Sequence, residues 1–301
     1  MKRFKVINVK ALLVVMALAL LTGCGRKEQK KTDGQVLKVE QENTDKDLID
    51  EDVLEGSHES DMEILQRLIE EQKALGADVS EELNDAEQYS WDEDGRLVKI
   101  AWAERNLNGE ISFHGLTALV ELYVNDNSLT AVDVSDCYNL FTLYCGHNQL
   151  VNLDTKNCRS LYEVICSYNQ LEAIDVSDCT ELFYFACGEN LLTKCNVSNC
   201  TKLVELHCQS NQLSTLDVTN CPNLQLLFFS DNMLDSLDLT KCTSLTILVC
   251  TNNQLRAIDV SNCPELVRLI CFDNQISTLD VSNCTKLEKL EYDDEVSVTG
   301  K

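Results

Sequence analysis

The stretch Leu140–Ser160, LFTLYCGHNQLVNLDTKNCRS, recurs along the chain with almost no change in spacing. Its next copies begin at Leu161, Leu182 and Leu203, and the series continues to Leu287. The shared pattern, L-x-x-L-x-C-x-x-N-x-L-x-x-L-D-V-S-x-C, has a period of 21 residues. Self-similarity at a fixed period of this length is typical of repeat architectures, so the fold is predicted from it.

Two polar columns of the repeat run through eight turns without an insertion. Asparagine recurs at Asn127, Asn148, Asn169, Asn190, Asn211, Asn232, Asn253 and Asn274. Cysteine recurs with the same step at Cys137, Cys158, Cys179, Cys200, Cys221, Cys242, Cys263 and Cys284. Because both columns keep the step of 21 residues, we expect the turns to superpose in register.

Each turn contains a segment with strand-like spacing. In Leu140–Ser160, the apolar residues Leu143 and Cys145 flank Tyr144, which predicts a short parallel strand with Tyr144 on its outer side. A single turn cannot bury its apolar side, whereas stacked turns share one continuous core. The asparagine side chain is expected to satisfy backbone groups where the chain leaves the strand.

The pattern L-x-x-L-x-L/C-x-x-N-x-L resembles the leucine-rich repeat. The 21-residue form with cysteine in the strand is similar to the internalin-type cysteine-ladder subgroup of bacterial surface proteins. This resemblance covers the last two-thirds of the chain. It implies an α/β repeat fold: a right-handed leucine-rich-repeat solenoid with a parallel β-sheet on its concave face, to which we add a small helical N-terminal cap.

The Asp of L-D-V-S forms a further column: Asp133, Asp154, Asp175, Asp217, Asp238, Asp259 and Asp280, with Asn196 in one turn. Asn can replace Asp in an Asx-type cap, so we interpret the column as backbone caps on the convex side. A calcium site is the alternative, but carboxylates about 5 Å apart repel and no Gly-Asp nonapeptide pattern accompanies them.

The 16 cysteines are interpreted mostly as small buried hydrophobes that stay reduced. In the strand column, Val124, Phe229 and Tyr292 replace cysteine, and Cys195 stands where other turns have Leu, Ile or Val. There is no C-x-x-C pattern, and the column points into the core, so a metal site is disfavoured. Redox sensing is expected only for a cysteine in an end turn.

The chain has 301 residues with 25 Lys and Arg against 50 Asp and Glu. Four basic residues and no acid precede Cys24, so a chain that begins there has 21 basic and 50 acidic residues, a net charge near −29. Such a charge opposes binding to nucleic acid and to anionic membrane surfaces. It favours basic partners, or serves solubility alone.

Residues 1–23 are predicted to be a signal peptide. A basic start, MKRFK, precedes the apolar run Ala11–Leu21, which is too short for a preferred transmembrane helix. The string L-T-G-C that follows resembles the bacterial lipobox. That resemblance implies that Cys24 receives a diacylglyceryl group and becomes the mature N-terminus. The predicted location is therefore the cell membrane, with the protein lipid-anchored and the solenoid on the extracytoplasmic side.

Residues 24–59 are polar and lack apolar periodicity, so we expect a lipidated, disordered stalk. Residues 60–96 are predicted to form the N-terminal cap of the solenoid. Ser60 and Glu63 form a capping box at the start of a helix, and Gly76 ends it. The apolar face of this helix is predicted to consist of Ile64, Leu65, Leu68, Ile69 and Leu75.

A short second helix is expected to begin at Ser80. Tyr89–Trp91 and Leu97–Trp102 are predicted to pair as a hairpin around an Asp-Gly turn. The spacing of Leu97–Phe113 matches that of the repeat one turn later, so it is interpreted as a degenerate first turn of 22 residues. The solenoid then covers residues 97–301.

The outward positions of the strands form the predicted concave surface. Neighbouring strands lie about 4.8 Å apart, so nine of them make a strip of roughly 40 Å. An apolar and aromatic stripe rimmed by acids runs along it, and such a patch often marks a contact surface. Strand propensity alone is the competing explanation. The candidate binding residues are Tyr123, Tyr144, Ile165, Tyr184, His207, Phe228, Val249 and Ile270.

No catalytic pattern is found, and neither an enzyme nor a cofactor is expected. His147 and His207 are predicted to lie roughly 14 Å apart, too far to share a metal ion. Cys208 points to the other side of the strand from His207, which excludes a Cys–His pair there. An isolated histidine on such a surface is expected to be solvated. The many carboxylates are not expected to meet in an apolar cleft that shifts their pKa values.

These features predict a lipid-anchored bacterial surface protein that binds a macromolecule through the concave face. The partner is expected to be a protein or a glycan on a cell surface or in the envelope, and the resemblance implies adhesion or protein recognition. The chain is expected to contact its own membrane through Cys24 and to bind no nucleic acid. The alternatives are a glycan-binding module, a passive structural envelope protein without a specific ligand, and a regulatory partner of another exported protein.

Overall fold

The computed structural model describes residues 60–300, so the predicted signal peptide, the stalk and Cys24 lie outside the described residues. One helix, α2 (Asp61–Ala74), is followed by eighteen short strands in the described part. Within residues 60–300, no helix has the length and apolar character needed to cross a membrane.

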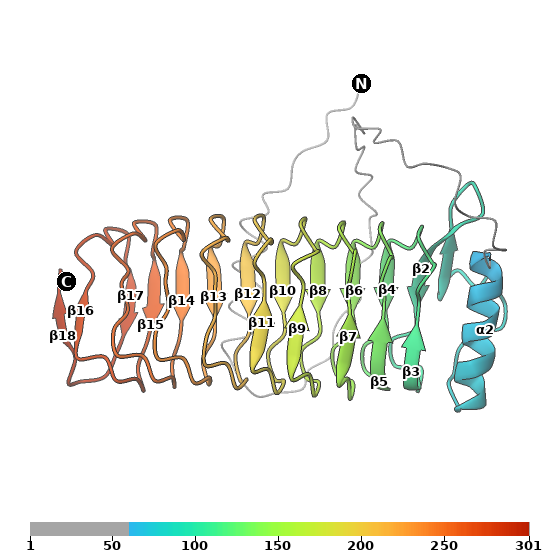
Figure 1. Ribbon diagram of the computed structural model, residues 1–301, viewed down its shortest axis with the longest axis horizontal. Helices are drawn as coiled ribbons and strands as arrows, with labels where there is room; N and C mark the ends of the chain where they lie inside the picture. The colour runs from blue at the N-terminus through green and yellow to red at the C-terminus, as the bar shows by residue number, and fades with distance from the viewer. Residues whose placement is uncertain (1–59, 301) are drawn as a thin grey trace, which may run out of the picture. The chain divides into compact units, whose positions relative to one another are not determined.

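The main sheet contains 11 strands, of which all but β1 run parallel. Figure 1 shows these strands side by side along the molecule. In sheet order they are β1 (Tyr89–Trp91), β2 (Leu97–Ala101), β4 (Glu121–Tyr123), β6 (Thr142–Tyr144), β8 (Glu163–Ile165), β10 (Tyr184–Ala186), β12 (Glu205–His207), β13 (Leu226–Phe228), β14 (Ile247–Val249), β15 (Arg268–Ile270) and β17 (Lys289–Glu291).

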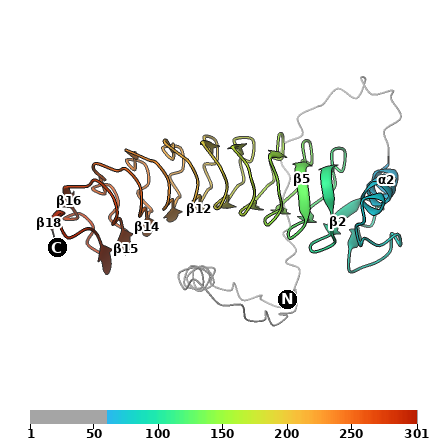
Figure 2. The same cartoon turned by 90° about the horizontal axis from the view of Figure 1, so that it is seen from below.

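A second set of strands lies on another side of the turns (Figures 1 and 2). They pair in parallel within three small sheets, which the sequence interpretation did not foresee. The sheets are β3 (Asn108–Ser112), β5 (Ser128–Asp133) and β7 (Asn152–Asp154); β9 (Ala173–Asp175) and β11 (Lys194–Asn196); and β16 (Thr278–Asp280) and β18 (Ser297–Thr299). The segments that were interpreted only as backbone caps therefore also carry ladder hydrogen bonds.

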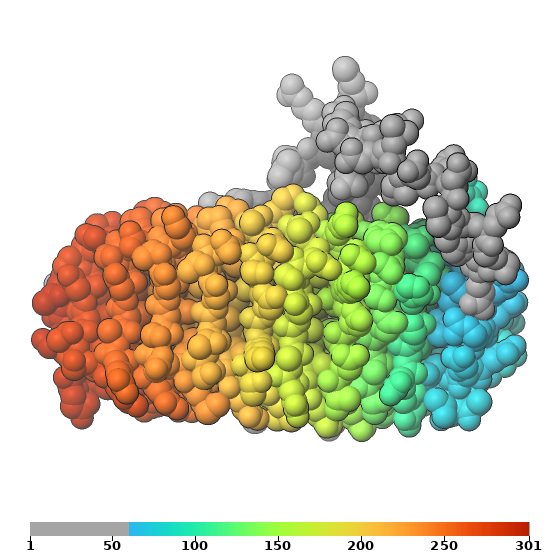
Figure 3. All heavy atoms as spheres, viewed as in Figure 1, coloured from blue at the N-terminus to red at the C-terminus, as the bar shows by residue number. Residues whose placement is uncertain are grey.

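The turns stack in strict register. Leu122 pairs with Leu143, and Leu143 with Val164, so each strand contacts its equivalent one repeat away. Figure 3 shows the stack as consecutive colour bands, in which each turn borders the turns next to it in sequence. The chain is therefore a parallel-strand solenoid of about ten turns, as the period of 21 residues predicts.

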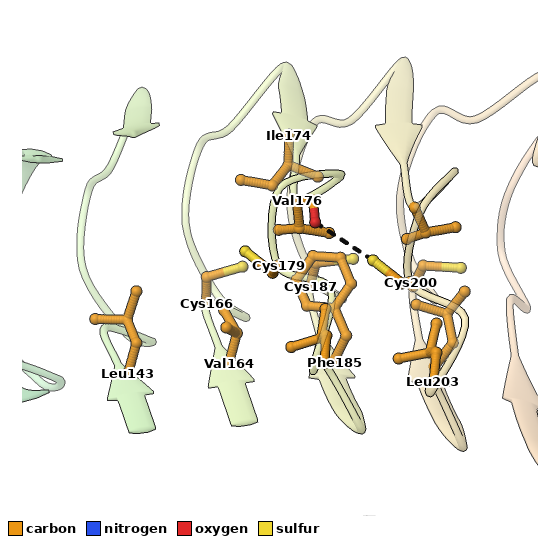
Figure 4. Packing of buried hydrophobic residues seen from close by; sticks show 14 of the residues in the cluster. Leu143, Val164, Cys166, Ile174, Val176, Cys179, Phe185, Cys187, Cys200 and Leu203 are labelled. Atoms are coloured by element: carbon orange, nitrogen blue, oxygen red, sulfur yellow. Dashed lines mark hydrogen bonds between the residues drawn. The ribbon is translucent and has the colours of Figure 1, made fainter. Parts of the chain in front are cut away.

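The core lies between the main sheet and the second set of strands. Leu143 and Cys145 are fully buried, whereas Tyr144 between them remains partly exposed, which confirms the predicted inside and outside of the strand. Figure 4 shows Leu143, Val164 and Phe185 in line, with the cysteines of neighbouring turns packed beside them. Burial of this ladder in every turn is the main favourable contribution to the solenoid.

The asparagine column joins successive turns. Asn148 donates from Nδ2 to the carbonyl oxygens of Val124 and Cys145, and its Oδ1 accepts from the Leu129 N–H. Val124 and Leu129 belong to the preceding turn, so one side chain satisfies backbone groups on two turns. The predicted role of this column is confirmed.

The aspartate column forms the Asx-type caps that the sequence predicts. In each turn from Asp133 to Asp280 the side-chain oxygen accepts the N–H of the residue two positions later. Asn196 accepts from the Ser198 N–H in the same way, at 3.1 Å. One geometry therefore explains both residue types.

The cysteines of residues 60–300 are all free thiols, and all but Cys195 are buried. The buried thiols agree with the sequence interpretation, and several thiols of the second column also donate hydrogen bonds. The Sγ of Cys158 donates to the Val134 carbonyl at 2.9 Å, and that of Cys200 to the Val176 carbonyl at 3.3 Å (Figure 4). A thiol can donate to the previous turn in a way that a Val side chain cannot, and cysteine occupies this column in all eight turns.

The N-terminal cap forms as predicted in its helix and hairpin. Ser60 and Glu63 make both hydrogen bonds of the capping box, and β1 pairs antiparallel with β2. Leu75 was wrongly assigned to the apolar face: it is exposed, because the helix ends at Ala74.

The second helix expected from Ser80 does not form. Residues 81–87 make turns instead, and the Asp85 side chain accepts the Glu87 N–H. The Ser80 N–H is taken by the side chain of Gln88. Side chains that bond to nearby backbone groups compete with a helix, and here they prevail.

Candidate functional site

The outward side chains of the main sheet come from the first and third residues of each three-residue strand, and we call this surface the main-sheet face. The inner residue of each strand, such as Leu143, is buried in the core. Because parallel partners are in register, equivalent side chains form columns across the face. All eight candidate residues predicted from the sequence lie on it.

These candidates are less exposed than the sequence interpretation supposed. Tyr123, Tyr144, Ile165, Tyr184 and Phe228 are half-buried. His207, Val249 and Ile270 are buried, with exposures of 4%, 9% and 6%. Neighbouring strands bring equivalent side chains so close together that each reduces the solvent exposure of the next. The stripe is therefore a packed layer with partly exposed rings, and not an open apolar patch.

Aromatic contacts run across the middle of the face. Tyr123 meets Tyr144 edge-on, with ring centroids 5.2 Å apart. His207 stacks on Phe228 at 4.5 Å and lies 5.5 Å from Tyr184. The face thus presents a band with two groups of interacting rings, one on β4 and β6 and one on β10, β12 and β13, and Ile165 on β8 lies between them. Val249 and Ile270 continue the band as aliphatic side chains on β14 and β15.

Two further ring stacks border this band, and the sequence reasoning missed the first of them. Phe141, Tyr162 and Phe183 stack with centroid distances of 4.8 Å at both steps, just before β6, β8 and β10. Their signal was an aromatic residue at the same repeat position in three consecutive turns. On the other border, His147 stacks on Tyr168 at 4.3 Å, and Tyr168 is 52% exposed.

The environment of His207 differs from the sequence prediction, which expected an isolated histidine on this surface to be solvated. Its Nε2 lies 2.5 Å from Oε1 of Glu205, and Glu205 is only 2% exposed. The histidine is therefore a buried, hydrogen-bonded part of the layer and not a solvated side chain. Sequence could have pointed to this pair, because residues two apart on a strand share a face.

The acids predicted to rim the stripe lie in one column of the face, and burial shifts the pKa of one of them, which was not expected. Glu121, Glu163 and Glu205 occupy the first position of β4, β8 and β12. Burial raises the pKa of Glu163, and the hydrogen bond from the Tyr144 hydroxyl offsets that shift only in part. Burial and the neighbouring Glu163 charge likewise raise the pKa of Tyr144. Near the other end, Arg268 and Lys289 occupy the same column, and Lys289 pairs with Glu291 on its own strand at 2.8 Å.

Among residues 60–300, no cluster of three or more His, Cys, Asp or Glu side chains is arranged to hold a metal ion. The Cys208 side chain is fully buried in the core, on the other side of the strand from His207. The face therefore offers rings, carboxylates and one histidine, which are groups suited to binding.

Known proteins support the fold class. No family profile and no curated sequence matches the chain, whereas many solved structures share its fold. The fold is that of leucine-rich-repeat proteins, with the internalin-like cysteine ladder that the repeat predicts.

Two solved structures illustrate the likeness. The functional domain of InlJ from Listeria monocytogenes, which includes a cysteine ladder, is 31% identical over 60% of this chain and 40% of its own, with a TM-score of 0.57. A leucine-rich-repeat protein from Leptospira interrogans is 26% identical over 58% of this chain and 50% of its own, with a TM-score of 0.53. The chain spans half or less of each of these structures.

Proposed function

We propose that the protein is a lipid-anchored bacterial surface protein whose main-sheet face binds another protein. We further propose that this face is the concave side of a right-handed solenoid, as in the repeat family that the sequence resembles. The observation that carries the proposal is the layer formed by the two ring groups on β4–β6 and β10–β13, bordered on both sides by the exposed aromatic side chains of Phe141 and Tyr168. Partly exposed aromatic residues on a rigid scaffold are typical anchors of protein interfaces.

The ring geometry favours a protein over a glycan. Sugars bind to the open face of an aromatic ring, but Phe141, Tyr162 and Phe183 turn their faces to one another, with interplanar angles of 5° and 7°. The same holds for His207 on Phe228, at 8°. In these stacks the ring edges and hydroxyl groups remain available, and they suit the side chains and backbone of a protein.

The partner-binding proposal is tested with Phe228→Asp and Tyr144→Asp. Each replaces a ring of the layer with a charged group and is expected to abolish the capture of surface proteins by the immobilised chain, because the partner loses an aromatic contact and meets a partly desolvated carboxylate. Tyr138→Asp is the matched control, since Tyr138 is exposed and lies outside the main sheet. Equal capture by all variants contradicts the proposal, and binding to a glycan array that Phe228→Asp abolishes favours the glycan alternative.

The membrane anchor is a separate proposal, supported by the L-T-G-C string before Gly25. Two acyl chains on Cys24 hold a protein on a membrane where one chain does not. Cells that express the chain are grown with a labelled fatty acid, and we expect label in the wild type and none in Cys24→Ala. Label that persists in Cys24→Ala contradicts the anchor.

A further inference from the structure

The three carboxylates of the main-sheet face differ in their partners. Glu121 pairs with Lys99, whose Nζ lies 3.5 Å from Oε2. Glu205 bonds to His207 at 2.5 Å. Glu163 lies between them in the same column, and within residues 60–300 it makes no ion pair with a Lys, Arg or His side chain.

Because Glu163 is partly buried, the lack of a cationic partner destabilises its charged form. The side chain is half-buried between Thr142 on β6 and Tyr184 on β10, its register partners. Its hydrogen-bond partner is the Tyr144 hydroxyl, a neutral donor. A carboxylate that has lost part of its water without gaining a cation is unfavourable in the free protein, and a cation supplied from outside relieves that cost.

Elsewhere on the face, a carboxylate beside a tyrosine ring does have a cationic partner. The ammonium of Lys99 on β2 pairs with Glu121 on β4 and also lies 5.4 Å from the centre of the Tyr123 ring. A cation between a carboxylate and a tyrosine ring gains from both contacts. Around Glu163 the tyrosine rings and the carboxylate are present, but the neighbouring strands contribute Thr142 and Tyr184 instead of a lysine.

We propose that Glu163, with the rings of Tyr144 and Tyr184, binds a lysine or arginine side chain of the protein partner. The inference rests on the proposed function and names its partner as a protein with a basic segment. Glu205 is the register partner of Tyr184 on the other side, so a second carboxyl group borders the site. The chain's net charge of −25 attracts such a segment, and Arg268 on β15 disfavours its binding at the other end of the face.

Two fluorescein-labelled peptides test the proposal with the full chain. One has four Gly-Ser-Arg repeats, and the other has citrulline, a neutral isostere, in place of arginine. Fluorescence anisotropy at 150 mM salt is expected to show binding of the arginine peptide and at least about tenfold weaker binding of the citrulline peptide. Absence of binding by the arginine peptide, or equal binding of both peptides, overturns the proposal.

The variants Glu163→Gln and Glu172→Gln distinguish specific binding at Glu163 from attraction by the net charge of the protein. Both remove one negative charge from the same turn, but Glu172 is exposed and lies outside the main-sheet strands. We expect Glu163→Gln to weaken binding of the arginine peptide about tenfold and Glu172→Gln to change it less than twofold. Equal losses in the two variants overturn the proposal, because net charge then explains the binding.

Capture of surface proteins distinguishes this inference from the proposed function. If Phe228→Asp abolishes capture but Glu163→Gln leaves both capture and peptide binding unchanged, the main-sheet face binds a protein and the cation site is wrong. If Phe228→Asp has no effect on capture, the proposed function fails as well. Circular dichroism of Glu163→Gln confirms that the variant is folded.

Discussion

At the scale of single residues, the asparagine and cysteine columns join one turn to the next. Asn190 is 6% exposed and donates to the carbonyl oxygens of Cys166, Cys187 and Gly188, while its Oδ1 accepts from the Leu171 N–H. The backbone groups it serves have no access to water. The side chain therefore acts as an internal replacement for solvent at a bend that every turn must make.

Replacing Asn190 with Ala is expected to destabilise the protein by about 3 kcal/mol or more, because several buried backbone groups lose their partner at once. Urea unfolding followed by circular dichroism measures the change. Asn262→Ala is the control, since Asn262 is exposed and makes only a 3.5 Å contact with Ser261. A loss for Asn190→Ala no larger than that for the control contradicts the assigned role.

The thiols are expected to react slowly in the native protein. Burial raises the pKa of Cys145 to about 12, and burial with nearby acids does the same for Cys137, so little reactive thiolate exists near neutral pH. Cys195 is the half-buried exception. In a Cys24→Ala background, a disulfide reagent at pH 8 should titrate about one thiol quickly, and Cys195→Ala should remove that phase. Fast reaction of most thiols contradicts this prediction.

At the scale of the structural element, each main-sheet strand from β4 to β15 is followed by a bend with an unusual backbone. The residue before each asparagine has a positive φ between 52° and 59°, although none of the eight is glycine: Asp126, His147, Tyr168, Glu189, Ser210, Asp231, Asn252 and Asp273. This left-handed conformation is costly for residues with a side chain. The hydrogen bonds of the asparagine column hold the bend in place despite that cost.

Glu189 is exposed, so its backbone can be tested without disturbing the core. Glu189→Val should lower stability by about 1–2 kcal/mol, because a β-branched residue tolerates positive φ poorly. Glu189→Gly should match or slightly exceed the wild type, since relief of strain offsets the greater freedom of glycine in the unfolded chain. Urea unfolding measures the stability of both variants. Equal stability of the Val and Gly variants contradicts the proposed backbone strain at this position.

The N-terminal cap is joined to the solenoid by Asp61. This buried carboxylate accepts from Arg96 Nε at 2.8 Å and Nη2 at 3.0 Å, and from the Leu97 N–H at 2.8 Å. Asp61→Ala is expected to lower the free energy of unfolding by about 2 kcal/mol. The loss is smaller than for a fully buried ion pair, because Arg96 is partly exposed. Hydrogen exchange should accelerate in α2 and β2 but not beyond β12, because each turn depends on its neighbours.

Exposed Glu70 on the same helix provides the control for that experiment. Glu70→Ala should leave the exchange of α2 and β2 unchanged. Faster exchange along the whole solenoid in Asp61→Ala contradicts the nearest-neighbour description, since it implies that the molecule opens as a single unit.

At the scale of the whole molecule, two sets of carboxylates respond to acid in opposite directions. Hydrogen bonds from the hydroxyl and N–H groups of Thr240 and Ser282 lower the pKa values of Asp238 and Asp280 from 3.8. Their contribution to stability is present above pH 3.8 and is lost as the pH falls through the lowered values. Burial raises the pKa of Glu163 from 4.5, so its unfavourable effect is present at neutral pH and disappears as the pH falls toward 4.5.

We therefore expect the stability difference between Glu163→Gln and the wild type to shrink as the pH falls from 7 toward 4.5. Glu163→Gln should be the more stable protein at pH 7, because it lacks the desolvated charge. Below pH 3.8 both proteins should lose stability together as the aspartate caps are protonated. Urea midpoints from pH 7 to pH 2.5 measure this, and a difference that is independent of pH contradicts the assignment.

The strands, the stacking and the cap helix could be predicted because they depend on period and on local capping. Leu143, Cys145 and Ser60 meet the same requirements in the sequence as in the structure. The burial of His207 and the lack of a cation at Glu163 could not be predicted. Both depend on which side chains the adjacent strands place beside them, and that is set one full turn away in the chain.

By itself, the sequence determined that this protein is a stack of equivalent turns, since a 21-residue period of apolar and asparagine positions has no other way to bury its apolar edge. Only the tertiary structure decided how open the outer surface is and which charges on it find a partner. The physical reason is that the inward columns repeat one chemistry, whereas the outward columns vary, so their properties arise from contacts between turns and not within one.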